Sequence, residues 1–183
     1  DYFRKATANL LKADSKVDLD IANSIWIREG IFTNESFKKA NQNYYDAEIG
    51  YLNFDLPSAV DFINRWCANK TNNRIDEILD NLNSETQLVL LNALYFKGTW
   101  FEKFEKKDTR DDIFINENGL SQDIKMMCQK SKVANTYNES FHIAELPYGN
   151  KAFCMTILLP NEKLPLDDAV ALLTSENWNK WTN

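Results

Sequence analysis

The sequence predicts an α+β fold of mixed helices and antiparallel strands. Three observations support this prediction. Apolar residues recur at helical spacing in some segments and at every second position in others. The segments of the two kinds follow one another without a regular βαβ rhythm, repeat or linker. The composition, with 44% hydrophobic and 26% charged residues over 183 positions, is ordinary for a globular domain.

The first part of the chain alternates between the two periods. One helical face is apolar over 2–12, and apolar and polar residues then alternate over 17–27, as in a strand. The same patterns predict the next elements, which are a helix over 34–44, a strand over 47–54 and a helix over 56–69.

The segment 56–69 carries the clearest helical stripe. Pro57 stands near its start, where a missing N–H costs little. We expect its face with Val60, Ile63 and Trp66 to pack on a sheet.

The residues that follow this helix indicate how it ends. Asn72 and Asn73 suit a left-handed cap, since Asn adopts positive φ more readily than most residues. Apolar residues over 75–82 then predict one or two further helical turns.

The segment 88–96 is apolar except for Asn92, and its pattern leaves two structures open. Leu and Ala favour a helix, and 84–87 matches a capping box. Its short length, with Gly98 just beyond, favours a strand buried on both faces. Asn92 either satisfies local backbone groups or belongs to a buried hydrogen-bond network that holds two strands together.

The second part of the chain is predicted to be rich in strands. They are expected over 113–115, 124–127, 133–137, 141–147 and 152–159. A hairpin loop over 148–151 joins the last two. Pro165 opens a further helix, and Ser175 begins another.

Charge and hydropathy exclude several functions. The net charge of −6 argues against nucleic-acid binding, which requires clustered Lys and Arg. No apolar run approaches the length of a membrane span. The three cysteines, Cys67, Cys128 and Cys154, are widely spaced and are expected to be buried free thiols.

No catalytic constellation is apparent. His142 is the only histidine, and its place inside a predicted strand favours a structural role. The paired acids at 111–112 and 167–168 are expected to be solvated. We therefore predict no enzyme activity, no metal and no cofactor, and a carboxylate-based hydrolase is the weakest alternative. Three Asn-x-Ser/Thr sequences occur, at Asn34, Asn69 and Asn138.

Several segments, in order, resemble the serpin family of serine-protease inhibitors. LNALYFKG at 91–98, followed by Trp100, resembles strand three of the family's main sheet, sheet A. The other matching pieces are ANSIWI at 22–27, YYDAEIGYLNF at 44–54, INRWCANKTNNRI at 63–75, Asp108–Thr109, KMM at 125–127, ELPY at 145–148 and the strand at 155–160 that ends in LP. Asn73 departs from the pattern, because the family usually has Gly there.

The resemblance implies a single incomplete domain over 1–183, from the region of helix D to the start of helix H, excised from a longer parent. By this resemblance Asn92 matches the shutter, and Trp100, Thr109 and Tyr148 match the breach; these regions gate the insertion of a cleaved reactive loop beside strand three. The parent is then a suicide inhibitor of a serine or alternatively a cysteine protease, and otherwise a non-inhibitory carrier or chaperone.

The resemblance also implies properties of this chain by itself. The reactive loop has no counterpart in 1–183, so the fragment is expected to be inactive. An unpaired edge along 88–96 is expected to promote self-association. An extracellular, cell-surface or periplasmic location is implied for the parent.

Overall fold

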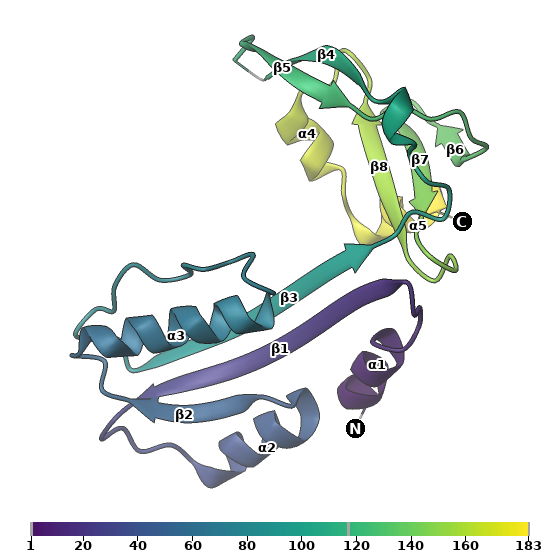
Figure 1. Ribbon diagram of the computed structural model, residues 1–183. Helices are drawn as coiled ribbons and strands as arrows, with labels where there is room; N and C mark the ends of the chain where they lie inside the picture. The colour runs from purple at the N-terminus through teal and green to yellow at the C-terminus, as the bar shows by residue number, and fades with distance from the viewer. Residues whose placement is uncertain (1, 117, 183) are drawn as a thin grey trace. The chain divides into compact units, whose positions relative to one another are not determined.

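The computed structural model describes residues 2–116 and 118–182. Helices, one mixed sheet and two antiparallel sheets are present, which confirms the α+β class (Figure 1). The chain divides into two compact units, one up to Lys97 and the other from Gly98 onward.

The first unit is built on a three-stranded sheet in the order β2-β1-β3. Its strands are β1 (Val17–Arg28), β2 (Glu48–Leu52) and β3 (Leu88–Gly98). Its helices are α1 (Tyr2–Leu10), α2 (Glu35–Tyr45) and α3 (Pro57–Lys70). β1 and β2 are parallel and are joined through α2, whereas β3 runs opposite to β1 (Figure 1). All six elements agree with the sequence prediction to within a few residues.

The core of the first unit lies between α3 and the sheet. Ile63 and Trp66 of α3 are buried together with Trp26 of β1 and Ala93 of β3. The rings of Trp26 and Trp66 meet edge to face, with centroids 6.0 Å apart. The predicted packing on the sheet is therefore confirmed for Ile63 and Trp66, whereas Val60 is half-buried and lies outside this core cluster. Apolar burial of this kind is the main stabilising contribution to a small unit.

Gly50 of β2 makes room for the largest side chain of this core. It lies opposite Trp26 in the parallel register. A Cβ at position 50 would be 2.8 Å from the Trp26 ring, which is closer than real contacts. The absence of a side chain at Gly50 therefore allows the indole to lie across β2.

The end of α3 confirms one prediction and corrects another. Asn72 and Asn73 adopt the expected positive φ, at 51° and 55°. The further helical turns predicted over 75–82 are absent, and that segment consists of bends and irregular backbone. Its backbone is held instead by the Asn64 side chain, whose Oδ1 accepts the N–H groups of Ile78 and Leu79 at 3.0 Å.

β3 resolves the ambiguity of 88–96 in favour of a strand, and it pairs with β1 as predicted. Its burial differs from the prediction. Val89 and Leu91 pack against the core, but Leu90 and Leu94 are 64% and 55% exposed. Burial on both faces was therefore wrong. In the described part of the chain β3 is the outer strand of its sheet, and α3 covers only one of its faces.

The second unit contains two small antiparallel sheets. β4 (Arg110–Ile115) pairs with β5 (Ser121–Met126), and a second sheet has the order β6-β7-β8. Its strands are β6 (Ala134–Tyr137), β7 (Phe141–Pro147) and β8 (Cys154–Pro160). A short 3-10 helix, η1 (Lys106–Asp108), precedes β4, while α4 (Leu166–Ala171) and α5 (Ser175–Thr182) follow β8. These elements were all expected except η1.

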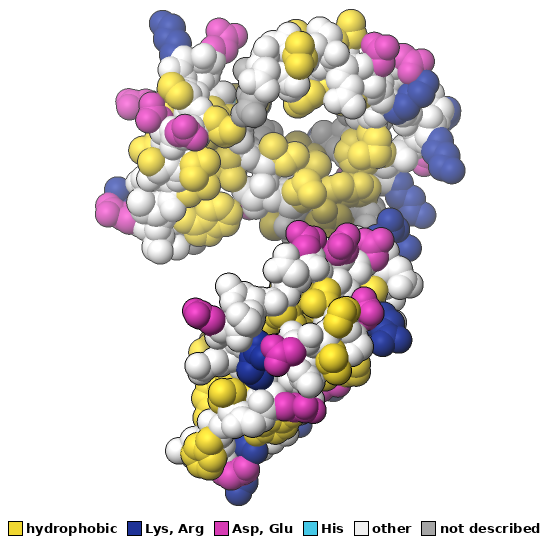
Figure 2. All heavy atoms as spheres, turned by 90° about the vertical axis from the view of Figure 1, so that its left-hand side faces the viewer, with side chains coloured by type: hydrophobic (Ala, Val, Ile, Leu, Met, Phe, Trp, Pro, Cys, Tyr) yellow, Lys and Arg dark blue, Asp and Glu magenta, His cyan; other side chains and the backbone are white. Residues whose placement is uncertain are grey.

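The core of the second unit is small. Phe141 and Ile143 of β7 are buried with Ala169 of α4, and Trp181 of α5 packs on them. The centroids of the Phe141 and Trp181 rings are 5.0 Å apart. Many large apolar side chains of the protein remain at the surface (Figure 2).

Candidate functional site

The resemblance implies a gating role for two groups of residues. One lies on β3 of the first unit, at Asn92. The other lies in the second unit, where Trp100 and Tyr148 meet.

Asn92 links two strands through its side chain. Its Nδ2 donates to Oδ1 of Asn23 on β1, at 2.9 Å. Asn23 in turn donates from Nδ2 to the carbonyl oxygen of Tyr45, the last residue of α2, at 2.8 Å. A chain of side-chain amides thus connects β3, β1 and α2. Of the two alternatives left open by the sequence, the link between two strands is present, but it is not a buried network because Asn92 is exposed.

Asn23 was not identified from the sequence as a functional residue. It sits in the motif ANSIWI, and its spacing from apolar neighbours suggests only a solvent-facing strand position. Pairing across the sheet brings it to Asn92, 69 residues away. No local signal could indicate this contact, because it depends on strand order.

The outward face of β3 beside Asn92 is apolar. Leu90, Leu94 and Phe96 alternate with the inward residues and are exposed. An exposed outer strand with apolar side chains is a surface on which a further strand can pair.

Trp100 and Tyr148 stack on each other. Their ring centroids are 4.4 Å apart with an interplanar angle of 15°. Backbone hydrogen bonds flank the stack, from Phe101 N to Pro147 O at 2.9 Å and from Gly149 N to Thr99 O at 2.8 Å. The segment after β3 is therefore clipped to the hairpin loop between β7 and β8.

The environment of Tyr148 shifts the pKa of its phenol. The residue is buried. Burial raises the pKa of Tyr148 above its usual value, and the charge of Cys154 raises it further.

Thr109 follows η1, and the structure describes no interaction between Thr109 and the Trp100–Tyr148 stack. Its N–H donates to Lys106 O at 3.2 Å, and it caps η1 in an extended conformation. The structure thus brings Trp100 and Tyr148 together but does not join Thr109 to them.

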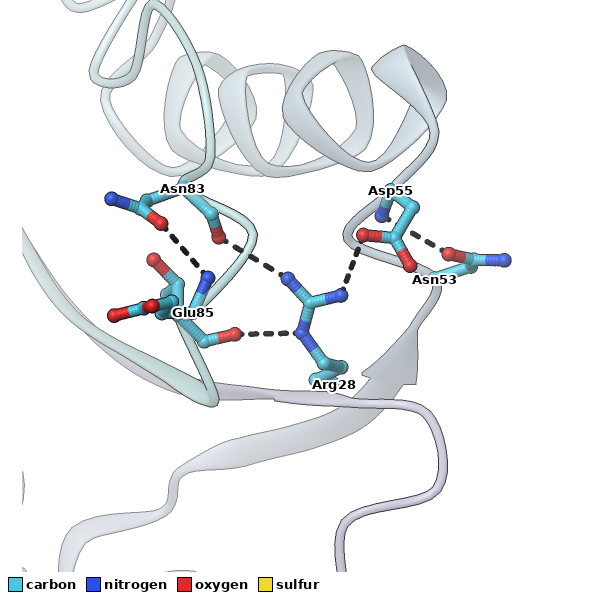
Figure 3. A network of polar contacts seen from close by, with 6 residues as sticks. Arg28, Asn53, Asp55, Asn83 and Glu85 are labelled. Carbon is cyan, nitrogen blue, oxygen red and sulfur yellow. Dashed lines mark hydrogen bonds and ion pairs between the residues drawn. The ribbon is translucent and has the colours of Figure 1, made fainter.

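Arg28, at the end of β1, is a second residue that the sequence did not single out. Its guanidinium donates to Asp55 Oδ1 at 2.7 Å, to Thr86 O at 2.8 Å and to Asn83 O at 3.2 Å. Figure 3 shows it between the loop before α3 and the loop before β3. The side chain of Arg28 is mostly buried, and it therefore links the loop before α3 and the loop before β3 to the end of β1.

His142 and the paired acids, considered from the sequence as catalytic candidates, lie on different elements in ordinary strand and helix positions. His142 is exposed and stacks on Tyr137, with centroids 4.5 Å apart. Asp111 pairs with Lys125 across the β4–β5 hairpin, and Asp167 and Asp168 lie in the first turn of α4. Within 2–116 and 118–182, no group of three or more His, Cys, Asp or Glu could hold a metal ion. No helix in these ranges is long and apolar enough to cross a membrane.

The cysteines fulfil their prediction only in part. All three are free thiols. Cys67 of α3 is buried in the core between that helix and the sheet, and burial raises its pKa. Cys154 is exposed and Cys128 half-buried, so the expectation of buried thiols was wrong for these two. Both lie in the second unit, whose core is too small to cover them.

Comparison with known proteins identifies the family. The family model "Serpin (serine protease inhibitor)" matches residues 1–183. Human neuroserpin is 28% identical over 99% of this chain and 47% of its own length, and human Serpin B8 is 38% identical over 80% and 41%. The crystal structure of Serpin-12 from Manduca sexta superimposes with a TM-score of 0.86, at 27% identity, over 96% of this chain and 51% of that one.

The chain spans about half the length of the curated relatives it matches. The match nevertheless runs through both units, and the family description is that of serine protease inhibitors. The collinear motifs, the observed strands and helices and these likenesses agree, and the chain belongs to the serpin family.

Proposed function

We propose that the whole protein to which this chain belongs is a suicide-substrate inhibitor of serine proteases, and that β3 is the strand beside which its cleaved loop inserts. The observation that carries the proposal is the exposed apolar outer face of β3, together with its outer position in the described part of the sheet. An inserting loop needs a strand that offers unpaired backbone groups and apolar side chains to cover.

The gating residues follow from the same proposal. Asn92 is assigned to the shutter by its match to the family pattern. Its bond to Asn23 ties β3 to β1, so the two strands would move together when a loop inserts on the outer side of β3. Trp100 and Tyr148 act at the breach, because their stack clips the segment after β3. Thr109 is assigned to the breach only by its match to the family pattern.

Residues 1–183 alone are proposed to inhibit no protease. They include one wall of the insertion slot and no counterpart of the reactive loop. The test mixes the purified chain with a panel of serine and cysteine proteases and follows residual activity and denaturing gels. We expect full protease activity and no SDS-stable complex. A stable complex with matching loss of activity would show that the inhibitory element lies within this chain.

The same edge is proposed to cause self-association of the isolated chain. Light scattering during size exclusion should show oligomers whose population falls in Leu90→Lys, since a charge on an edge strand opposes strand pairing. Leu166→Lys on α4 is the matched control, because Leu90 and Leu166 are 64% and 63% exposed. A monomer at high concentration, or equal effects of both variants, would contradict this proposal.

Two further properties are proposed on the strength of the family. The two units are parts of one serpin-type domain, which the match of a single family model to 1–183 supports. The whole protein is extracellular. Immunodetection in culture medium against cell lysate tests the second proposal.

A further inference from the structure

The fold places the three Asn-x-Ser/Thr sequences in three different local structures. Asn34 precedes α2, Asn69 lies in the last turn of α3, and Asn138 lies between β6 and β7. An asparagine in such a sequence accepts an oligosaccharide on its amide nitrogen, and the hydroxyl two residues later takes part in recognition. The position of that hydroxyl therefore separates the three sites.

At Asn34 the folded chain presents both groups. The residue is exposed and extended, with φ −64° and ψ 131°, as the N-cap of α2. Its Oδ1 accepts the N–H of Ser36 at 2.8 Å and the Ser36 hydroxyl at 2.8 Å. The cap uses only the oxygen, so modification of the nitrogen leaves both capping bonds intact. Asn34 and the Ser36 hydroxyl are thus held next to each other at the surface.

At Asn69 the hydroxyl two residues later, on Thr71, is buried. Thr71 is 1% exposed, and its Oγ1 donates to Cys67 O at 2.8 Å. The same Oγ1 accepts the N–H of Ile75 at 3.1 Å. Recognition of this hydroxyl would require the last turn of α3 to open, which costs free energy.

Asn138 has an intermediate environment. It is half-buried, and its Oδ1 accepts the N–H groups of Ser140 at 2.8 Å and Phe141 at 2.7 Å. The bond to Phe141 fixes the turn that leads into β7. Access to this site is therefore more restricted than at Asn34.

We propose that Asn34 is an N-glycosylation site, and that it is the acceptor among the three that stays competent after the chain folds. The donor class is a lipid-diphosphate-linked oligosaccharide. The asparagine Nδ2 forms a bond to C1 of the first sugar, the bond from C1 to the diphosphate oxygen breaks, and an Nδ2 proton is lost as the lipid diphosphate leaves. Occupancy in the cell rests on the proposed extracellular location.

The test uses the folded 183-residue chain, a purified single-subunit oligosaccharyltransferase and a lipid-linked oligosaccharide. Mass spectrometry of peptides gives the rate at each site, and circular dichroism confirms that each protein is folded. We expect Asn34 to be modified at least about tenfold faster than Asn69, because Asn69 needs local opening. A short peptide spanning 64–74 should be modified at Asn69, which shows that the sequence itself is acceptable.

Three variants sharpen the assignment. Asn34→Asp keeps a capping oxygen but has no amide nitrogen, and Ser36→Ala keeps the N–H that the cap uses but has no hydroxyl; each should abolish the glycan at position 34. Asn69→Gln is the matched control and should leave that glycan unchanged. Equal rates at Asn34 and Asn69 in the folded chain, or an unmodified Asn34, would overturn the proposal.

A second arm places the chain behind a cleavable secretion signal in insect cells. A mobility shift that is removed by peptide-N-glycosidase and by Asn34→Asp supports the site in the cell. If natural expression of the whole protein leaves Asn34 bare while both artificial arms modify it, the extracellular location is wrong and the site assignment stands.

Discussion

β1 and β3 are neighbours in one sheet, and their burial is the reverse of their hydrophobicity. β3 reads LVLLNALYFKG and is the more apolar strand, whereas β1 reads VDLDIANSIWIR and carries charges. Yet four consecutive residues of β1, from Ser24 to Ile27, are buried, while β3 buries only Ala93 fully. Sheet position accounts for the difference: β1 is central, and β3 is the outer strand of the described sheet.

The contacts of the described residues do not account for the apolar outer face of β3. A strand that is apolar on both faces usually lies inside a fully covered sheet. On β3 the residues Leu90 and Leu94 face away from the core that α3 covers. Their character fits a surface that another segment covers, as the proposed loop insertion requires.

The largest expected effect tests the covered face. Trp66→Ala should cost about 3–5 kcal/mol in the free energy of unfolding, because it removes a buried ring from the core shared by α3, β1 and β3. Urea denaturation measures the loss. Trp66→Phe is the control, since it keeps an aromatic ring but removes the 2.8 Å bond from Trp66 Nε1 to Glu48. A loss below about 1 kcal/mol for Trp66→Ala would contradict the packing.

A matched pair compares the two strands directly. Ile27→Ala on β1 should cost about 2–5 kcal/mol, since Ile27 is fully buried. Leu94→Ala on β3 should cost below about 1 kcal/mol, since more than half of Leu94 is already in contact with water. Both side chains have four carbons beyond the backbone, so the difference reports burial. Equal losses would show that the outer face of β3 is covered in solution.

A smaller effect is expected from the amide link between these strands. Asn92→Ala and Asn23→Ala should each destabilise the chain, and the double variant should lose less than the sum of the two. A coupling energy of about 0.5–1.5 kcal/mol is expected for one neutral hydrogen bond. Additive losses would indicate that the two side chains do not interact in solution.

The smallest effect concerns pH. Burial raises the pKa of Cys67 above its reference value of 9.0. The contribution of the Cys67 thiol to the free energy of unfolding is complete below that reference pKa, where the folded and the unfolded chain both hold the proton. It is lost as pH rises toward the folded pKa, because the unfolded chain releases the proton first.

The measurement compares the wild type with Cys67→Ala in urea titrations from about pH 7 to about pH 10. The wild type should lose more stability across this interval than the variant. Tyr148, whose pKa is also raised, is common to both proteins and cancels in the difference. Parallel pH profiles would contradict a shifted thiol in the core.

Most of the secondary structure, and the family, could be predicted from the sequence. The helical spacing of apolar residues located α3, and Pro57 and the Asn72–Asn73 turn marked its start and its end. Such signals can be read from sequence because they depend on local φ preferences and on neighbouring side chains. The helix prediction was wrong for 75–82. Its apolar residues suggested a helix, but the side chain of Asn64 in α3 holds the backbone of this segment in bends.

Only the tertiary structure decided what depends on strand order. The helix-or-strand ambiguity of 88–96 was settled by pairing with β1, and the burial of β3 was settled by its outer position. The partners of Asn92 and Arg28 also became visible only there. The physical reason is that hydrogen bonds and burial across a sheet join residues separated by more than 50 positions, and no local pattern of side chains specifies which residues these are.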